Sequence, residues 1–421
     1  MPPASDYGIS VDVGTTHVTL HLVRLSDLHV VCQHVVQNSQ MQFGADIISR
    51  VSHAIKKREN AKQLTVLIRN AVEDGISAIL RHQRLEPSLV SQVTIVGNTV
   101  MHHLFFDLAV TSLSKAPYTA DDKDAIRIHA VEAGLPILDE AECYSPPLVE
   151  SFIGADAPAV MLASGFLESK INHIAIDVGT NTEIAVKSLQ GTWIASAASG
   201  PAFEGMSMQC GMPGDSGAIS DVEIDSRTFR PKIEVMGGGR PRGVCGTGAI
   251  SALAEMLDRN IILPRGSFNR ELNSRWLNLE SSPVYYILAD SKVSKTGQLI
   301  VISQPDVRML QQSKAAIRGV LDILLIEAGL ESNEVQSLYL TGIFGSGLQI
   351  EDAYRIGMFP KFPKAKIVQY SKGASLGADL LMISENRRKV EELVKQLNYI
   401  EMSDNPAFKA QYFNSMPFPD Q

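Results

Sequence analysis

One motif occurs twice in this chain and constrains its fold more than any other feature. The segments YGISVDVGTTHVTLHLV (Tyr7–Val23) and HIAIDVGTNTEIAV (His173–Val186) each place Asp-Val-Gly-Thr between two runs of apolar, strand-forming residues. The two aspartates, Asp12 and Asp177, lie 165 positions apart. The pattern predicts two β-hairpins, each opening one part of a 421-residue chain that is long enough for two or three domains.

The tip of each predicted hairpin has the composition of a phosphate-binding loop. Glycine allows a tight turn in which backbone N–H groups converge, and threonine hydroxyls add further donors. An aspartate at the strand end would repel a phosphate unless a divalent cation lay between them. A carboxylate, Mg²⁺ with several waters and a polyphosphate therefore form a consistent set. Two such hairpins predict two loops that grip one phosphate chain from opposite sides.

A third glycine-rich segment follows at the same interval. In LTGIFGSGL the glycines begin at Gly342, 165 positions after Asp177 and directly after an apolar strand. Small residues there would let a purine or ribose press against the backbone. Elsewhere strands alternate with amphipathic helical stretches such as Leu64–Leu80 and Leu310–Ala328, which is the pattern of an α/β protein.

The hairpins also suggest how the chain is divided. We expect a first lobe over residues 1–168 and a C-terminal lobe over residues 169–421. The segment 116–154 is richer in proline and polar residues, and we interpret it as a linker or excursion ahead of the second lobe.

Composition argues against several other classes of protein. Hydrophobic residues make up 45% of the chain and charged residues 20%, as in globular proteins. Because the chain has no long apolar run and no signal peptide, we expect a cytoplasmic protein that does not act at a membrane. The net charge of −8 disfavours binding to nucleic acid. The four cysteines form no CxxC pair, so we expect no iron–sulfur cluster within this chain.

The ordered series of motifs resembles a known family. A phosphate hairpin, a second phosphate hairpin and a glycine-rich adenosine loop, in that order, look like the actin/sugar kinase/chaperone ATPase superfamily. Connecting segments are similar to those of the ATP-dependent reductive activators of corrinoid proteins: QFGADIISRV, VGNTVMHHL, SGPAFEG, RGVCGTG, YRIGMFP, NPAF and SMPFP. The resemblance runs from Tyr7 to Pro419. It implies a two-lobed, actin-like (ribonuclease H-like) α/β fold with the nucleotide bound between the lobes.

The family resemblance also implies an activity and partners. Members use ATP to drive electron transfer onto a corrinoid cobalt, which restores Co(I) from Co(II) after accidental oxidation during methyl transfer. We therefore expect an ATPase, a corrinoid protein as its partner, and a homodimer. Family members usually carry an iron–sulfur domain ahead of the first hairpin. We expect this chain either to be the nucleotide-binding part of a longer protein or to rely on an external electron donor, so that it does not reduce cobalt alone.

The same resemblance implies a set of site residues. Asp12 and Asp177 are expected to act in catalysis and to hold Mg²⁺ through water. Glu204 is expected to position the attacking water as a general base. ATP would be bound by the two hairpin tips, by a helix N-terminus and by the adenosine loop. The residues in these segments are Gly14, Thr15, Thr16, Gly179, Thr180, Asn181, Thr182, Gly246, Thr247, Gly248, Gly342, Phe344 and Gly345.

Two other functions are compatible with these motifs. The first is a small-molecule kinase on the same scaffold, in which Glu204 or Asp215 activates a substrate hydroxyl. The second is a switch without enzymatic activity, in which nucleotide sets the angle between the lobes and is not hydrolysed. A P-loop ATPase is excluded because the chain contains no GxxxxGK[ST] motif.

Overall fold

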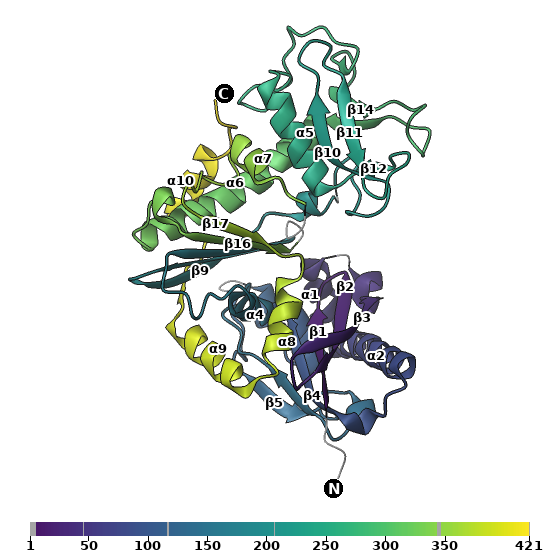
Figure 1. Ribbon diagram of the computed structural model, residues 1–421, viewed down its shortest axis with the longest axis vertical. Helices are drawn as coiled ribbons and strands as arrows, with labels where there is room; N and C mark the ends of the chain where they lie inside the picture. The colour runs from purple at the N-terminus through teal and green to yellow at the C-terminus, as the bar shows by residue number, and fades with distance from the viewer. Residues whose placement is uncertain (1–5, 45, 116–117, 206, 343–346, 421) are drawn as a thin grey trace. The chain divides into compact units, whose positions relative to one another are not determined.

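Both predicted hairpins form, and each begins a mixed sheet (Figure 1). The chain folds into two units, the first of residues 1–170 with 372–399 and the second of residues 171–371 with 400–421. The computed structural model describes residues 6–44, 46–115, 118–205, 207–342 and 347–420.

The first unit is built on a six-stranded sheet of order β3-β2-β1-β4-β6-β5. Strands β1, β2 and β3 are antiparallel neighbours, whereas β4 runs parallel to β1 and β6 parallel to β4. Its elements are β1 (Tyr7–Val13), β2 (His17–Arg24), β3 (His29–Gln37), η1 (Ser39–Phe43), α1 (Ile47–Ala54), α2 (Arg58–Gln83), η2 (Pro87–Leu89), β4 (Val90–Gly97), α3 (Thr99–Phe106), η3 (Ser112–Ser114), β5 (Ile126–His129), η4 (Pro136–Leu138), β6 (Glu142–Ser145), α4 (Asp156–Ala163), α8 (Gly373–Leu380), α9 (Ser384–Gln396) and β18 (Asn398–Tyr399).

The second unit contains a sheet of order β17-β16-β7-β8-β9 and a smaller inserted region with two three-stranded sheets. The inserted strands lie between β9 and the long helix α6. The elements of this unit are β7 (His173–Val178), β8 (Thr182–Ser188), β9 (Gly191–Ala197), η5 (Pro201–Glu204), β10 (Ala218–Ile224), β11 (Pro231–Val235), β12 (Gly243–Val244), α5 (Gly246–Asp258), β13 (Leu277–Asn278), β14 (Tyr285–Ala289), β15 (Ile300–Ser303), α6 (Gln304–Glu327), η6 (Ser332–Glu334), β16 (Ser337–Gly342), α7 (Ile350–Arg355), β17 (Lys366–Gln369) and α10 (Pro406–Asn414).

The repeated motif reflects a repeated topology. In each unit the hairpin strands pair antiparallel with a third strand, and the strand that carries the aspartate pairs on its other edge with a parallel strand. A long helix joins the third strand to that parallel strand in both units, α2 in the first and α6 in the second. The same strand arrangement therefore occurs in both units, and the aspartate is the penultimate residue of its strand each time.

Local sequence explains where the long helices form. In α2 the residues Leu64, Ile68, Val72, Ile76 and Ile79 recur at helical spacing and are buried, so one face of this helix packs on the sheet. Helix α6 begins six residues before the predicted start, because Ser303 and Asp306 form a capping box around Pro305. It ends, as predicted, before Gly329, whose φ of +63° suits a residue without a side chain.

The structure differs from the predicted domain organisation in two parts of the chain. The interpretation of residues 116–154 as a linker is wrong, because this segment supplies β5 and β6 of the first sheet. The predicted boundary assigns residues 372–399 to the C-terminal lobe, but α8 and α9 pack with the first unit. Figure 1 shows both helices, in yellow-green, beside the purple and blue elements of that unit.

No helix in the described ranges is both long enough and apolar enough to cross a lipid bilayer.

Candidate functional site

The first hairpin presents a half-buried carboxylate at the end of its strand. Asp12 is the penultimate residue of β1, and its Oδ2 accepts a hydrogen bond of 3.0 Å from the Ser375 hydroxyl on α8. Burial raises the pKa of Asp12, although the hydrogen bond from Ser375 opposes this shift. The fold therefore holds this charge where solvation is poor, an arrangement that favours an external cation.

A second carboxylate lies next to Asp12, and sequence reasoning missed it. Asp156 is the first residue of α4, and its Oδ1 accepts a 2.9 Å hydrogen bond from the amide of Ala157. Burial, together with the negative charge of Asp12, raises the pKa of Asp156 to about 7. Acidic residues are common in the first turn of any helix. The sequence therefore carried no sign that this one faces the hairpin.

The carboxylates of Asp12 and Asp156 fit the donor set that Mg²⁺ prefers. Burial raises the pKa of both carboxylates, and the charge of Asp12 raises that of Asp156 further. A divalent cation placed near both would stabilise their ionised forms. Mg²⁺ is commonly held by one or two carboxylates and completes its shell with waters and phosphate oxygens. In the part of the chain that the structure describes, no group of three or more His, Cys, Asp or Glu is arranged as a metal site. The first hairpin is therefore suited to a cation that arrives with its own oxygen ligands.

The tip of the first hairpin is held by hydrogen bonds to three consecutive carbonyl groups. Asn38 Nδ2 donates to Gly14 O at 2.9 Å, and the Asn38 amide donates to Thr16 O at 2.9 Å. Arg50 Nη2 donates to Thr15 O at 2.5 Å. The Arg50 side chain is fully buried, and burial lowers its pKa to about 10. The conformation of the tip is thus fixed by the fold before any ligand binds.

The second hairpin brings together two of the predicted residues. Thr180 Oγ1 donates to Glu204 Oε1 at 2.5 Å, and the amide of Gly200 donates to Thr180 O at 2.8 Å. Burial raises the pKa of Glu204, and its hydrogen bonds with Thr180 oppose that shift. A glutamate with a raised pKa at the tip of a phosphate-type loop has the properties of a general base.

Other predicted residues of this hairpin have structural partners. The hydroxyl of Thr182 is buried and lies 2.8 Å from Ser199 Oγ, which also donates to Gly179 O at 3.1 Å. The Gly179 amide donates to Asn181 O at 3.1 Å, which closes the turn. The contacts of Thr182 therefore help to shape the hairpin.

The glycines at the start of α5 are explained by close packing. A Cβ atom on Gly246 would lie 1.7 Å from Phe203 O, and one on Gly248 would lie 2.1 Å from Ile219 O. Between them, the half-buried Thr247 places its hydroxyl 3.3 Å from Cys245 Sγ. The N-terminus of α5 consequently lies directly against η5, the short helix that ends in Glu204.

Gly342 lies beside Asp177, as the order of the motifs suggested. Strand β16 runs parallel to β7 with Thr341 opposite Asp177. A Cβ on Gly342, whose φ is +73°, would lie 2.3 Å from Val178 O and 2.5 Å from Asp177 Oδ1. Only glycine can fit there. The other two residues predicted for the adenosine loop, Phe344 and Gly345, lie outside the described residues.

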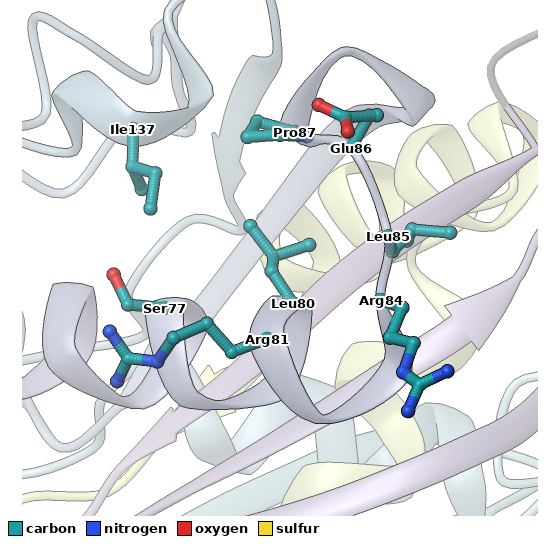
Figure 2. Close-up of a pocket in the computed structure, with 8 residues that line it drawn as sticks. All are labelled: Ser77, Leu80, Arg81, Arg84, Leu85, Glu86, Pro87 and Ile137. Carbon is teal, nitrogen blue, oxygen red and sulfur yellow. The ribbon is translucent and has the colours of Figure 1, made fainter.

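A groove of about 380 Å³ lies away from these residues, at the C-terminal end of α2 (Figure 2). Figure 2 shows Leu80, Pro87 and Ile137 around the groove, with the side chains of Arg81 and Arg84 extending to opposite sides. None of the predicted site residues lines it. The hairpin residues are therefore the better candidates for a functional site.

Comparison with known proteins identifies both halves of the chain. Residues 7–169 match the profile described as the RACo middle region, and residues 172–421 match the C-terminal domain of RACo, the ASKHA domain. The corrinoid activation enzyme RamQ of Eubacterium limosum is 30% identical over 98% of this chain and 70% of its own length. The Co(II) methylated amine-specific corrinoid protein reductase of Methanosarcina barkeri is 25% identical over 98% of this chain and 77% of its own.

A solved structure has the same fold. The reductive activator for corrinoid, iron-sulfur protein superposes with a TM-score of 0.86 and 28% identity over 98% of this chain. The match covers 66% of the solved chain, so this chain spans just under two thirds of that protein. Together with the ASKHA description of residues 172–421, it confirms the predicted actin-like α/β fold class.

Proposed function

Because this chain belongs to the RACo family of reductive activators of corrinoid proteins, we propose that it hydrolyses ATP to drive reduction of a corrinoid cobalt from Co(II) to Co(I). The observation that supports this most is the pair of aspartate hairpins, one in each unit, each with a threonine-bearing tip fixed by hydrogen bonds. The electron comes from an iron–sulfur domain or from a separate donor protein. The homodimer and the cytoplasmic location stay predictions.

The proposed site uses residues from both hairpins on one nucleotide. Asp12, Asp156 and Asp177 would hold Mg²⁺ through its water ligands, and the tips centred on Thr15 and Thr180 would bind the terminal phosphates. When bound, Mg²⁺ offsets the negative charge of the phosphate chain in the transition state. Asp156 enters this set because of its position beside Asp12, although sequence reasoning did not include it.

Glu204 is proposed to accept the proton of the attacking water. Its carboxylate is oriented by the Thr180 hydroxyl, so a water bound next to it would also lie near the phosphate-binding tip. A base is most effective when its pKa approaches the working pH, and burial shifts the pKa of Glu204 in that direction.

The test of the proposed function is ATP turnover with and without a purified methyl-transfer corrinoid protein in the Co(II) state. We expect phosphate release to rise when the corrinoid protein is added. With an electron donor present, Co(I) should form as seen by its absorption spectrum. Two outcomes would contradict the proposal. A phosphorylated small molecule as the product would indicate a kinase, and tight ATP binding without hydrolysis would indicate a nucleotide switch.

Glu204→Gln should separate catalysis from binding. We expect turnover to fall by about 10² to 10⁴-fold, as is typical for loss of a general base, while ATP affinity changes by less than about threefold. Phosphate release and calorimetric titration with ATP measure the two effects. Glu223→Gln is the control, because Glu223 is an exposed glutamate paired with Lys232. Equal losses of turnover and affinity in Glu204→Gln would remove this residue from the role of base.

A further inference from the structure

Helix α8 is joined to β1 by two hydrogen bonds that run in register. Ser375 Oγ donates to Asp12 Oδ2 at 3.0 Å, and Ser10 Oγ donates to Asp379 Oδ1 at 2.5 Å. Four residues of helix rise about 6.0 Å, and two residues of strand span about 6.6 Å. The spacing of Ser375 and Asp379 therefore matches that of Asp12 and Ser10, and the two bonds fix how far α8 lies along the strand.

Of the two hydrogen bonds between α8 and β1, the one to Asp379 has additional support from a neighbouring side chain. His21, directly opposite Ser10 in the β1–β2 pair, places Nδ1 at 3.0 and 3.1 Å from the two carboxylate oxygens of Asp379. Ser10 is 2% exposed, His21 7% and Asp379 3%. A buried carboxylate is costly unless it is paired and hydrogen-bonded, and these three side chains satisfy one another across two strands and a helix.

A shift of α8 along β1 would disturb the carboxylates of both Asp12 and Asp156. The helix crosses α4 so closely that a Cβ on Gly377 would lie 2.0 Å from Ala159 O. Helix α4 begins with Asp156, and α8 carries the hydroxyl that contacts Asp12. The position of α8 along β1 therefore bears on the geometry of the Asp12–Asp156 pair.

We propose that Ser10, His21 and Asp379 are positioning residues for Asp12. They fix α8 in the one register in which Ser375 meets Asp12, and so set the direction in which that carboxylate faces Mg²⁺. Among the described residues, no hydrogen bond joins any of the three to the hairpin tip, and the effect of Ser10 and Asp379 passes through α8 and Ser375. His21 also acts on Asp12 directly, because burial raises the pKa of that carboxyl and the charge of His21 lowers it. The Mg²⁺ part of this inference rests on the proposed function, whereas the register of α8 does not.

Ser10→Ala tests the inference without changing any charge. We expect the Mg²⁺ concentration for half-maximal ATP turnover to rise by about tenfold, the scale of losing one hydrogen bond to a charged group. Turnover at saturating Mg²⁺ should change much less. Thr94→Val is a matched control, because Thr94 pairs with Ser10 in the sheet, is fully buried, and has a hydroxyl without a partner among the described residues. If Ser10→Ala behaves like Thr94→Val, the inference is overturned.

A second measurement does not depend on ATP. Amide hydrogen exchange in α8 should become about tenfold faster in Ser10→Ala and stay unchanged in Thr94→Val, since the lost bond lowers the free-energy cost of local opening.

The double variant Ser10→Ala/Ser375→Ala should need the same Mg²⁺ concentration for half-maximal ATP turnover as Ser375→Ala alone. Multiplicative losses would mean that Ser10 does not act through Ser375. A wild-type protein without ATP turnover would contradict the proposed function, and the exchange data would still decide the role of Ser10.

Discussion

Asp12→Asn and Asp177→Asn should each lower ATP turnover by about 10³-fold or more. The amide is nearly the same size as the carboxylate but has no charge with which to hold the water ligands of Mg²⁺. A metal ion contributes several kcal/mol of charge stabilisation in the transition state, and each 1.36 kcal/mol is about tenfold in rate. Both hairpins should show the effect, since each contributes to binding the same phosphate chain.

Stability measurements separate this loss from damage to the fold. Because burial raises the pKa of Asp12 above its ordinary value, its ionised form is less favourable in the folded state than in the unfolded chain at neutral pH. Asp12→Asn should therefore unfold at the same temperature as the wild type or at a higher one.

Asp27→Asn is the control for ATP turnover, because Asp27 lies in the exposed turn between β2 and β3. Full phosphate release by either hairpin variant would refute the assignment.

Arg387→Ala is expected to reduce the free energy of unfolding of the first unit by about 3 kcal/mol. The Arg387 guanidinium is almost fully buried and donates to Glu142 Oε2, Gln92 Oε1 and Leu381 O at 3.1, 2.7 and 2.7 Å. It also lies 4.5 Å from the centre of the Tyr144 ring. Alanine would remove these contacts together and leave the polar groups of β4 and β6 without their partner.

Arg388→Ala provides the comparison for Arg387→Ala. Arg388 is the next residue of α9 and is exposed, so its loss should change the free energy of unfolding by less than about 0.5 kcal/mol. Chemical denaturation, followed by a probe in the first unit, measures both variants. Equal and small effects would show that α9 does not anchor to the first sheet through Arg387.

Patterns that are local in the sequence predicted much of this fold. The apolar, strand-forming runs on either side of Asp12 and Asp177 form the two hairpins, and the stretch with helical spacing from Leu64 to Leu80 forms part of α2. Such elements are predictable because the residues that determine them are close in the chain. The general α/β class then followed from the alternation of strands and helices, and the actin-like fold from the family resemblance that the ordered motifs carry.

Features that depend on distant parts of the chain were not predictable in the same way. Asp156 lies close enough to Asp12 for the two charges to interact, and Ser375 donates a hydrogen bond to Asp12 across 363 positions. An acidic residue at a helix start, or a serine within a helix, has many possible roles until the tertiary structure brings it to a strand end. The proline-bearing segment 116–154 was misinterpreted for a related reason. Strands β5 and β6 are only four residues long, and their place in the sheet depends on pairing with the distant strand β4.

The interrupted first unit has a consequence for how the protein is made. Residues 171–371 separate its opening segment from α8 and α9. At synthesis rates of about 5–20 residues per second, a ribosome needs roughly 10–40 s to deliver that stretch. During this interval the nascent β1 strand lacks its covering helix, so a chaperone has time to bind it. The first aspartate acquires its serine partner only after residues 171–371 have been made.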